Sequence, residues 1–288
     1  SPLNVHGFGL KHALASADHE NKNWKIYSRT KEDFKNQKYK VVSFPHSFNM
    51  NVKEIKTNQK QWPGIFNGSG TIIEFECGKT LFNTIRKGIP GRPTFSTCLD
   101  YLREELGYIY AGVIEKGKAN IIIQSKDYNK PVEAVKPRWL GFYKPEPGNT
   151  KLNLGGGELT IEYQFGEMGE SSYVKHYKRN MSTSGVEIRV NGRVLMSNIF
   201  KEIWNIEEHP SFNHFLVIIN LITQNLDALP KTRTSKNGIR TGDEKLDGLF
   251  EWIRATHPNP QKDLSGAVSE KELFSKAGTV ASTKLITD

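Results

Sequence analysis

Apolar and polar residues alternate along several stretches of the chain, and this pattern predicts β-strands. Residues 24–29 (WKIYSR) and 39–44 (YKVVSF) alternate with a period of two and are expected to pair with each other. A third strand is predicted at residues 71–75, a run rich in β-branched side chains. Further along, residues 119–124 are predicted to form a short buried strand, and residues 157–165 a second one.

The clearest local pattern lies at residues 186–196, where two alternating runs, VEIRV and RVLM, flank Asn191 and Gly192. Asn-Gly is the dipeptide preferred in type I′ turns, whose two central residues need positive φ angles. A tight β-hairpin is therefore predicted. Residues 215–222 (FLVIINLI) are rich in Val and Ile and are predicted to be a central strand, although His209 and Pro210 ahead of them could instead begin a helix.

Helical periodicity occurs in three segments. The first is expected to begin after Gly9 and to end near Asp18. In the second, Thr97 is expected to cap the helix, with Asp100 three residues on. The apolar face of this second helix is predicted to consist of Leu99, Leu102, Leu106, Ile109 and Val113. The third helix carries Leu246, Leu249, Phe250 and Ile253 on one side.

A composition break at residues 87–93 (KGIPGRP) predicts a domain boundary, because two glycines and two prolines interrupt any regular element. We expect a first domain at residues 1–91, a second at 92–258, and a tail at 259–288 that holds a short helix. Both halves combine predicted strands with predicted helices. The expected fold class is therefore α/β or α+β.

The chain carries 40 Lys and Arg residues against 31 Asp and Glu residues, a formal net charge of +9. This excess is compatible with a polyanionic partner such as DNA, because basic side chains that neutralise phosphates release counterions. The densest basic stretch consists of Lys175, Lys178 and Arg179, beside Tyr173 and Tyr177. It is a candidate nucleic-acid contact, and a solvated loop is the alternative.

Neither a membrane segment nor a metal site is indicated by the sequence. No apolar run approaches the roughly 18 residues that a spanning helix needs. The first residues lack the basic segment and apolar core of a secretory signal, so a cytoplasmic or, in a eukaryote, nuclear location is expected. Cys77 and Cys98 occur without a CxxC motif or clustered His, and are expected to be structural thiols rather than zinc ligands.

Three features could contact a phosphate group. The first is the glycine-containing box HGFGLKHA, which includes Gly7, Gly9, Leu10 and Lys11. Glycines ahead of a helix N-terminus expose backbone N–H groups suited to anions, and Lys11 adds a positive charge in the first turn. An ordinary turn before a helix is the alternative. No GxxxxGK[ST] sequence occurs, so the box is not a P-loop.

The second and third features lie far apart in the sequence. Gly70 and Thr71 enter a predicted strand, where a small residue lets a nucleotide approach the backbone and a hydroxyl can bond a base or a phosphate. Lys231 and Lys236 lie in a basic loop after Pro230 that can reach a phosphate if it folds toward the first domain. A plain strand start and an exposed basic loop are the alternative interpretations.

The order of these features resembles that of the GHKL ATPases, the superfamily of gyrase B, histidine kinases and the MutL proteins. Within it the chain looks most like the MORC and MutL branches. The resemblance implies that the box at residues 7–11 closes the ATP lid and begins a helix that faces the phosphates. It also implies that Gly70 and Thr71 lie on a strand beside the adenine pocket.

The resemblance extends into the second half of the chain. Residues 99–124 are similar to the opening helix and strand of the family's transducer domain, which has a ribosomal-protein-like fold. Residues 185–195 (GVEIRVNGRVL) resemble the hairpin of MutL-like proteins that contains an NGR sequence. Residues 229–238 (LPKTRTSKNG) resemble the loop that carries the sensor lysine to the γ-phosphate, and Lys236 is favoured over Lys231 for this role.

The resemblance implies an α+β chain in which residues 1–91 are the remainder of a GHKL (Bergerat-type) α/β sandwich and residues 92–258 are the transducer. The family's boxes for the general base, for Mg²⁺ and for adenine precede the lid and are not found in this sequence. They are expected upstream of Ser1. Because hydrolysis needs a base and a metal, this chain alone is expected neither to bind nor to hydrolyse ATP well.

The function implied by the resemblance is an ATP-dependent switch, with Mg²⁺, in a DNA-acting protein of the repair, restriction or defence, or chromatin type. Closure of the lid would drive dimerisation or position a fused or associated effector. Two alternatives stay open at this point: a non-catalytic nucleic-acid-binding module that uses residues 175–179 and 231–240, and a protein-interaction domain.

Overall fold

The computed structural model describes residues 23–43, 53–56, 68–75, 83, 86–87, 89, 91–140, 148–205, 210–231, 239 and 242–256. The chain divides into two compact units, one of His6–Gly91 and one of Arg92–Asp288 together with Ser1–Val5. Strands and helices are mixed within the chain, which has the α+β fold class expected from the sequence. The assignment of residues 1–91, 92–258 and 259–288 to an ATP-binding domain, a transducer and a tail stays a prediction.

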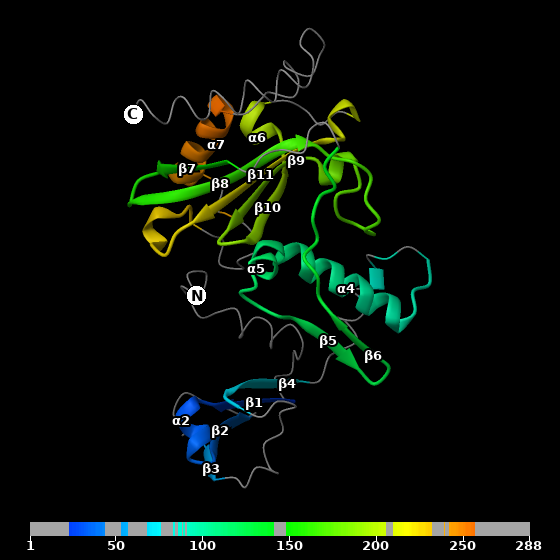
Figure 1. The fold of residues 1–288 in the computed structure, drawn as a ribbon, viewed down its shortest axis with the longest axis vertical. Coiled ribbons are helices and arrows are strands. Elements are labelled where there is room, and N and C mark those ends of the chain that lie inside the picture. The colour runs from blue at the N-terminus through cyan, green and yellow to red at the C-terminus, as the bar shows by residue number, and fades with distance from the viewer. Residues whose placement is uncertain are drawn as a thin grey trace. The chain divides into compact units, whose positions relative to one another are not determined.

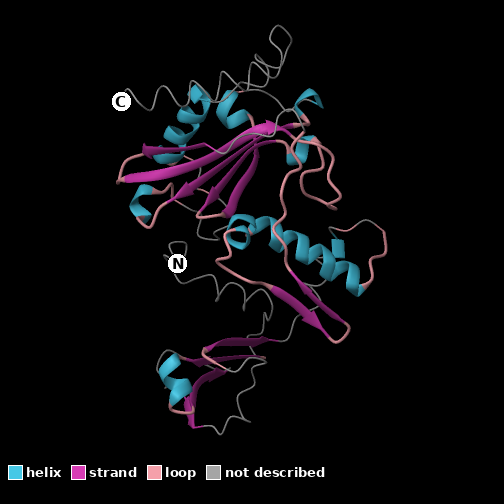
Figure 2. Cartoon of the chain, in the orientation of Figure 1, coloured by secondary structure: helices cyan, strands magenta, loops and turns pink. Residues whose placement is uncertain are grey.

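The first unit contains a four-stranded antiparallel sheet in the order β3-β2-β1-β4 (Figure 2). Its strands are β1 (Trp24–Arg29), β2 (Lys38–Ser43), β3 (Lys53–Lys56) and β4 (Gly70–Phe75). The three strands predicted in this region are confirmed, and β1 pairs with β2 as expected. Strand β3 was missed because its sequence, KEIK, has one apolar residue and therefore shows no alternation.

A short helix that the periodicity did not reveal, α2 (Lys31–Lys35), follows β1 directly. It begins with a capping box. The Thr30 hydroxyl accepts a hydrogen bond from the backbone N–H of Asp33 at 3.0 Å, and the Asp33 carboxylate accepts one from the backbone N–H of Thr30 at 2.9 Å. Two N–H groups that the first turn leaves unpaired are satisfied in this way, so a helix of a single turn is stable at this point.

The second unit is built on a five-stranded sheet whose central strand comes last in the sequence. The strands β7 (Gly148–Asn153), β8 (Glu158–Glu167), β9 (Gly185–Val190), β10 (Arg193–Ile199) and β11 (Phe215–Ile222) lie in the order β10-β9-β11-β8-β7 (Figure 1). Strand β11 is parallel to β9 and antiparallel to β8. The predicted hairpin and the predicted central strand are both confirmed, and Pro210 begins only a 3-10 turn, η4 (Pro210–Phe212).

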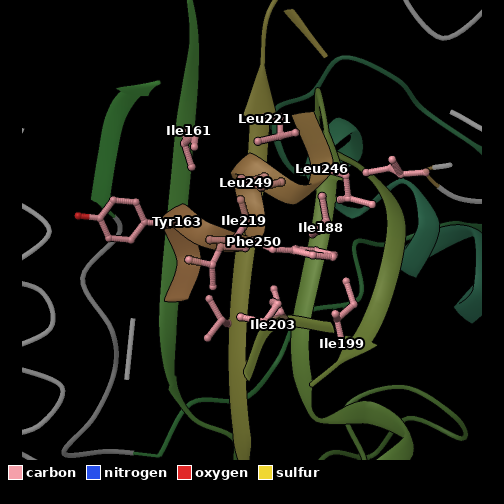
Figure 3. Close-up of a cluster of buried hydrophobic side chains, with 14 of the residues drawn as sticks. Ile161, Tyr163, Ile188, Ile199, Ile203, Ile219, Leu221, Leu246, Leu249 and Phe250 are labelled. Carbon is pink, nitrogen blue, oxygen red and sulfur yellow. The ribbon is translucent and has the colours of Figure 1, made fainter. Parts of the chain in front are cut away.

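One face of this sheet packs against α6 (Lys201–Trp204) and α7 (Glu244–Thr256) and forms the main apolar core. Figure 3 shows side chains of α7 lying over Ile161, Ile219 and Ile188, which come from three neighbouring strands. The predicted apolar side of α7 is confirmed, because it is buried in this core: Leu246, Leu249, Phe250 and Ile253. Full burial of one such side chain contributes about 1.5–3 kcal/mol.

The opposite face of the sheet is covered by α4 (Phe95–Ile109), and α5 (Ala111–Glu115) follows it (Figure 1). The cap of α4 is Thr94, whose hydroxyl accepts from the backbone N–H of Thr97 at 3.2 Å, so the prediction of Thr97 as the cap is wrong. The helix buries Cys98, Tyr101 and Gly107. The predicted leucine face is only half-buried.

The segment after α5 forms a separate two-stranded ribbon of β5 (Ile122–Ser125) and β6 (Tyr128–Pro131) (Figure 2). The strand predicted in this region is confirmed at Ile122–Ser125, but its predicted burial is wrong, because Ile122 is 63% exposed. The ribbon is attached to α4 by Asp100, which accepts a hydrogen bond from the Tyr128 hydroxyl at 2.7 Å and one from Lys130 at 3.0 Å.

The remaining short elements are the 3-10 turns η3 (Met181–Thr183) and η5 (Leu226–Ala228). In the described part of the chain, no helix has the length and apolar character that crossing a membrane requires. Cys98 is a buried free thiol, whereas Cys77 lies outside the described residues. The predicted helix near Gly9 and the short helix of the tail also lie outside them.

Candidate functional site

Gly70 and Thr71 begin strand β4, as the sequence predicted, and face Arg29 and Ser28 across the ladder to β1. Arg29 is 3% exposed, and its Nε donates a hydrogen bond to the carbonyl of Gly68 at 2.7 Å. Its guanidinium also lies 4.9 Å from the centre of the ring of Phe34, a residue of helix α2. The turn that leads into Gly70 is therefore braced by β1 and α2. A role of Gly70 and Thr71 in binding adenine stays a prediction.

The candidate phosphate-binding lysines are only partly within the described residues. The lid box with Gly7, Gly9, Leu10 and Lys11 lies outside them, and so does Lys236. Lys231 is described: it directly follows Pro230 and is exposed. The contribution of each of these residues to nucleotide binding stays a prediction.

The segment that leads to Lys231 is fixed by the sheet and by two neighbouring elements. Directly after β11, the backbone of Thr223 is hydrogen-bonded to the side chain of Asn191. The side chain of Asn225 donates to the carbonyl of Gly156 at 2.9 Å, in the turn between β7 and β8. The ammonium group of Lys245 in α7 donates to the carbonyl of Asp227. The chain therefore reaches Lys231 along a defined path.

The basic stretch that was considered for nucleic-acid binding has partners inside the protein. Lys175 Nζ lies 2.5 Å from Glu105 Oε1, and Arg179 Nη2 lies 3.2 Å from Glu167 Oε1. Lys178 Nζ donates to the carbonyl of Tyr173 at 2.8 Å. Because Lys175 and Arg179 pair with carboxylates, the stretch offers less uncompensated charge to phosphates than its sequence suggests, whereas the carbonyl that Lys178 contacts is neutral.

The carboxylate of Glu104 on α4 fastens this basic loop to the helix. It accepts hydrogen bonds from three successive backbone N–H groups, those of Val174, Lys175 and His176, at 2.7, 2.8 and 3.1 Å. The ring Nδ1 of His176 lies 3.0 Å from the same carboxylate. Burial acts to raise the pKa of Glu104, but the hydrogen bonds from His176 and from these N–H groups outweigh it and lower the pKa to about 2.

A buried polar cluster lies between this loop and strand β9. Glu187 is 1% exposed and accepts hydrogen bonds from Arg189 Nε at 2.6 Å and from the Tyr177 hydroxyl at 3.0 Å. Burial, together with the charge of Glu187, raises the pKa of Tyr177 well above its usual value. Burial and Glu187 also raise the pKa of Tyr108, whose ring stacks on His176 with 4.0 Å between ring centres.

A cavity of about 230 Å³ opens beside this cluster. Helix α4, the loop of residues 171–184, and strands β9, β10 and β11 form its walls, which include Tyr108, Tyr177 and Glu187. Two residues that line it, Tyr177 and Asn198, have left-handed backbone angles, with φ of 52° and 58°. Asn adopts this conformation readily, but for a bulky residue such as Tyr177 it is strained, and this strain accompanies the close packing of the loop on the sheet.

Comparison with known proteins gives structural likenesses of low sequence identity. No protein-family model matches the chain, and no curated protein matches it. One is the ATPase domain of MutL from Aquifex aeolicus, solved with ADP. The alignment covers 77% of this chain and 75% of the MutL chain, at 11% identity and a TM-score of 0.32. The N-terminal domain of a DNA repair protein aligns with 82% and 70%, at 12% identity and a TM-score of 0.43. The B-subunit of DNA gyrase from Myxococcus xanthus aligns with 81% and 66%, at 8% identity and a TM-score of 0.38.

At these identities the function has to be argued from the residues of the chain itself. Sequence reasoning missed Glu104, Glu187 and Arg189, whose hydrogen bonds join the loop of residues 171–184 to α4 and to strand β9. The signal for two of them was present, because Glu187 and Arg189 occupy alternate positions of β9 and must share one face of the sheet. Among the described residues there is no group of His, Cys, Asp and Glu arranged to hold a metal ion.

Proposed function

We propose that the chain forms part of a nucleotide-operated switch of the GHKL type. ATP would bind between the lid box at residues 7–11 and the strand that Gly70 and Thr71 begin. A lysine of the loop after Pro230 would contact the γ-phosphate. The observation that carries the proposal is the order of these features along the chain, with the Gly-Thr pair at the start of a strand and the lysine loop at the exit of a central strand.

The residues of the chain fit this role in part. Gly70 has no side chain to exclude a base, and Thr71 adds an exposed hydroxyl beside it. A lysine ammonium provides the charge that a terminal phosphate requires. Bound Mg²⁺ would neutralise the phosphates during hydrolysis, and the boxes that would hold it in the family are not found in this sequence. The chain's own part would be closure and sensing rather than proton transfer.

We further propose that the switch acts on DNA and works as a homodimer or by positioning an effector domain. The net charge of +9 is compatible with the DNA part of this proposal. The alternative of a non-catalytic nucleic-acid module is less well supported, because Lys175 and Arg179 already pair with carboxylates within the protein. A surface that binds phosphates strongly needs charge that is not compensated internally.

The test is steady-state ATP hydrolysis by the full-length protein with single lysine substitutions. Lys236→Ala is expected to lower kcat roughly 100-fold, because removal of one preorganised group that stabilises transition-state charge has an effect of this order. Lys231→Ala is expected to have a smaller effect. Lys126→Ala, which removes an exposed lysine in the β5–β6 turn, is the matched control and should be neutral.

Three results would contradict or change the proposal. Full activity in both Lys236→Ala and Lys231→Ala would exclude the lysine loop as a phosphate sensor. Loss of activity in Lys231→Ala alone would mean that Lys231, and not Lys236, is the phosphate sensor. An unchanged Tm of the full-length protein with millimolar ATP and Mg²⁺ would remove nucleotide binding altogether, because a ligand that binds the folded state raises its stability.

A further inference from the structure

The turn of the β9–β10 hairpin is bonded to the end of β11 as well as to its own strands. Asn191 has a φ angle of 50°, as a type I′ turn requires. Its backbone N–H donates to the carbonyl of Leu221 at 2.9 Å. Its side-chain Nδ2 donates to the carbonyl of Thr223 at 3.0 Å, and its Oδ1 accepts from the N–H of Thr223 at 3.2 Å. Asn191 therefore makes three hydrogen bonds to the chain at the end of β11.

The side chain of Asn191 takes the place of a strand residue. The ladder between β9 and β11 ends where Val190 pairs with Leu221, because the chain turns away at Asn191. A carboxamide carries one donor group and one acceptor oxygen, like a peptide group. By bonding both backbone groups of Thr223, it extends the pairing of β11 beyond the last residue of β9. The turn itself does not need this side chain, since glycine also adopts positive φ angles.

The turn is itself held in place from the other side. The N–H of Gly192 donates to Oδ1 of Asn220 at 2.9 Å, and its carbonyl accepts from the N–H of Gly112 at 3.0 Å. A Cβ added at Gly192 would lie 2.7 Å from the backbone of Gly112, so the turn and the start of α5 are in close backbone contact. The carboxamide of Asn191 thus projects from a fixed point.

Residues 223–229 are ordered by contacts that begin at Thr223. Its hydroxyl accepts from the N–H of Asn225 at 3.0 Å, and Oδ1 of Asn225 accepts from the N–H of Asp227 at 3.0 Å. Leu229 is buried at the end of this series, and Lys231 follows two residues later. Asn191 is therefore the residue outside 223–229 that contacts the first residue of this segment, Thr223.

We propose that Asn191 is a positioning residue that fixes residues 223–231, the segment through which the chain enters the phosphate-sensing loop. This inference rests on the proposed function for its consequence, and on the hydrogen bonds of Asn191 for its geometry. Without the carboxamide, the backbone of Thr223 loses its two bonds to the hairpin turn, and the segment leaves β11 with one anchor fewer. The lysine that follows is then presented to the phosphate in more than one position.

The first test is amide hydrogen exchange on the chain itself. Asn191→Gly keeps the positive φ angle and removes the side chain. It is expected to speed exchange at residues 223–229 roughly tenfold, the factor that corresponds to the net contribution of about one hydrogen bond. Asn180→Ala is the control, because the side chain of Asn180 also accepts local hydrogen bonds, from the hydroxyls of Ser182 and Thr183, but lies in a different loop. It should leave residues 223–229 unchanged.

The second test is ATP hydrolysis by full-length Asn191→Gly. A positioning role predicts a fall in kcat of about tenfold with little change in KM, because the misplaced group acts in the transition state more than in the bound ground state. Asn191→Asp keeps the acceptor for the N–H of Thr223 and should restore part of the loss. Unchanged exchange at residues 223–229 in Asn191→Gly would overturn the inference, and so would faster exchange with unchanged kcat.

The failure of the proposed function gives a different pattern. If the protein hydrolyses no ATP, or if both lysine variants hydrolyse it normally, the sensing loop is excluded, whatever Asn191→Gly does to hydrogen exchange. If the lysine variants lose activity and Asn191→Gly does not, the switch stands and the role of Asn191 is excluded.

Discussion

Glu187 and Arg189 lie two positions apart on β9, and both side chains leave the sheet on the face that α4 covers. Removing two charges from water is costly, and mutual attraction offsets this cost only when hydrogen bonds complete the pair. Tyr177 supplies such bonds, with its hydroxyl between Glu187 and Nη2 of Arg189. The left-handed backbone of Tyr177 places its ring there, so a strained loop residue completes the buried pair.

Removal of one member of this pair should be far more damaging than removal of both. Arg189→Met leaves Glu187 charged and buried, and is expected to lower the free energy of unfolding by about 3–5 kcal/mol. The double variant Glu187→Leu with Arg189→Met has no buried charge and should be clearly more stable than the single variant. Urea denaturation followed by circular dichroism measures both. A double variant that is less stable than Arg189→Met would contradict the expectation.

Two glycines in helices are expected to respond to alanine in opposite directions. A Cβ at Gly112 in α5 would lie 2.7 Å from the backbone of Gly192, so Gly112→Ala should destabilise the protein by roughly 1–3 kcal/mol. A Cβ at Gly248 in α7 would meet Leu154 at an ordinary 3.5 Å. Gly248→Ala should therefore stabilise the protein by about 0.5–1 kcal/mol, the usual gain in a helix interior.

The measurement for this pair is Tm, with each variant serving as the control for the other. Equal effects of the two substitutions would mean that helix propensity, and not the contact between Gly112 and Gly192, decides the outcome.

At the scale of elements, α4 shows why a helical stripe of leucines can mislead. The spacing of Leu99, Leu102 and Leu106 predicted that this side faces the core, yet the helix turns Cys98, Tyr101 and Gly107 inward. The sheet face beneath α4 carries the apolar Leu216 and Ile218 as well as the buried Glu187 and Arg189, and Gly107 packs against Glu133 and Val135 and not against the sheet. The identity of the facing surface is a tertiary property, which the periodicity of one helix does not contain.

Elements with strong local signals could be predicted from the sequence, and elements that depend on a partner could not. The Asn191–Gly192 turn, strand β11 and helix α7 each carry their own pattern of apolar residues or turn residues. Strand β7 has the sequence GNTKLN, and its alternation is too weak to recognise. It is a strand because β8 offers it a full edge of backbone groups. The same argument applies to β3 beside β2.

The attachment of α4 to the loop of residues 171–184 should depend on pH through Glu104. Its pKa in the folded protein is about 2, below the usual 4.5, so its stabilising contribution is complete above about pH 4.5 and is lost as the pH falls toward 2. Glu104→Gln is expected to be less stable than the wild type at pH 7, and this difference should disappear near pH 2. Urea denaturation of both proteins across this range tests it. A difference that is independent of pH would show that Glu104 acts through packing alone.

At the scale of the molecule, the main apolar core lies within the second unit, from Leu159 to Ile253. A unit that contains its own core can fold alone. We therefore expect residues 92–258, produced without residues 1–91, to unfold cooperatively in urea, with the near-ultraviolet dichroism of packed aromatic side chains. A gradual transition without that signal would mean that the second unit needs the first one to fold.

The candidate site was less accessible to prediction than the fold. Its proposed parts come from both units, and short motifs such as Gly70–Thr71 carry little information singly. A nucleic-acid role of Lys175 and Arg179 stays a prediction, and the carboxylates that pair with them, Glu105 and Glu167, are distant in sequence. These ion pairs depend on the fold and could not be predicted from the sequence alone. Asn191 was predicted as a turn residue, whereas its bonds to Thr223 depend on β11 lying beside β9.

Strand β11 is central in the sheet but is the last of its strands to be synthesised, and this order has a consequence for biosynthesis. When the ribosome has released residues up to 199, the two ribbons β7–β8 and β9–β10 exist, but the inner edge of each has no neighbour until residues 215–222 emerge. Unpaired edges are templates for pairing with other chains. A translational pause between β10 and β11 should therefore promote aggregation of the nascent protein, whereas a pause after α7 should not.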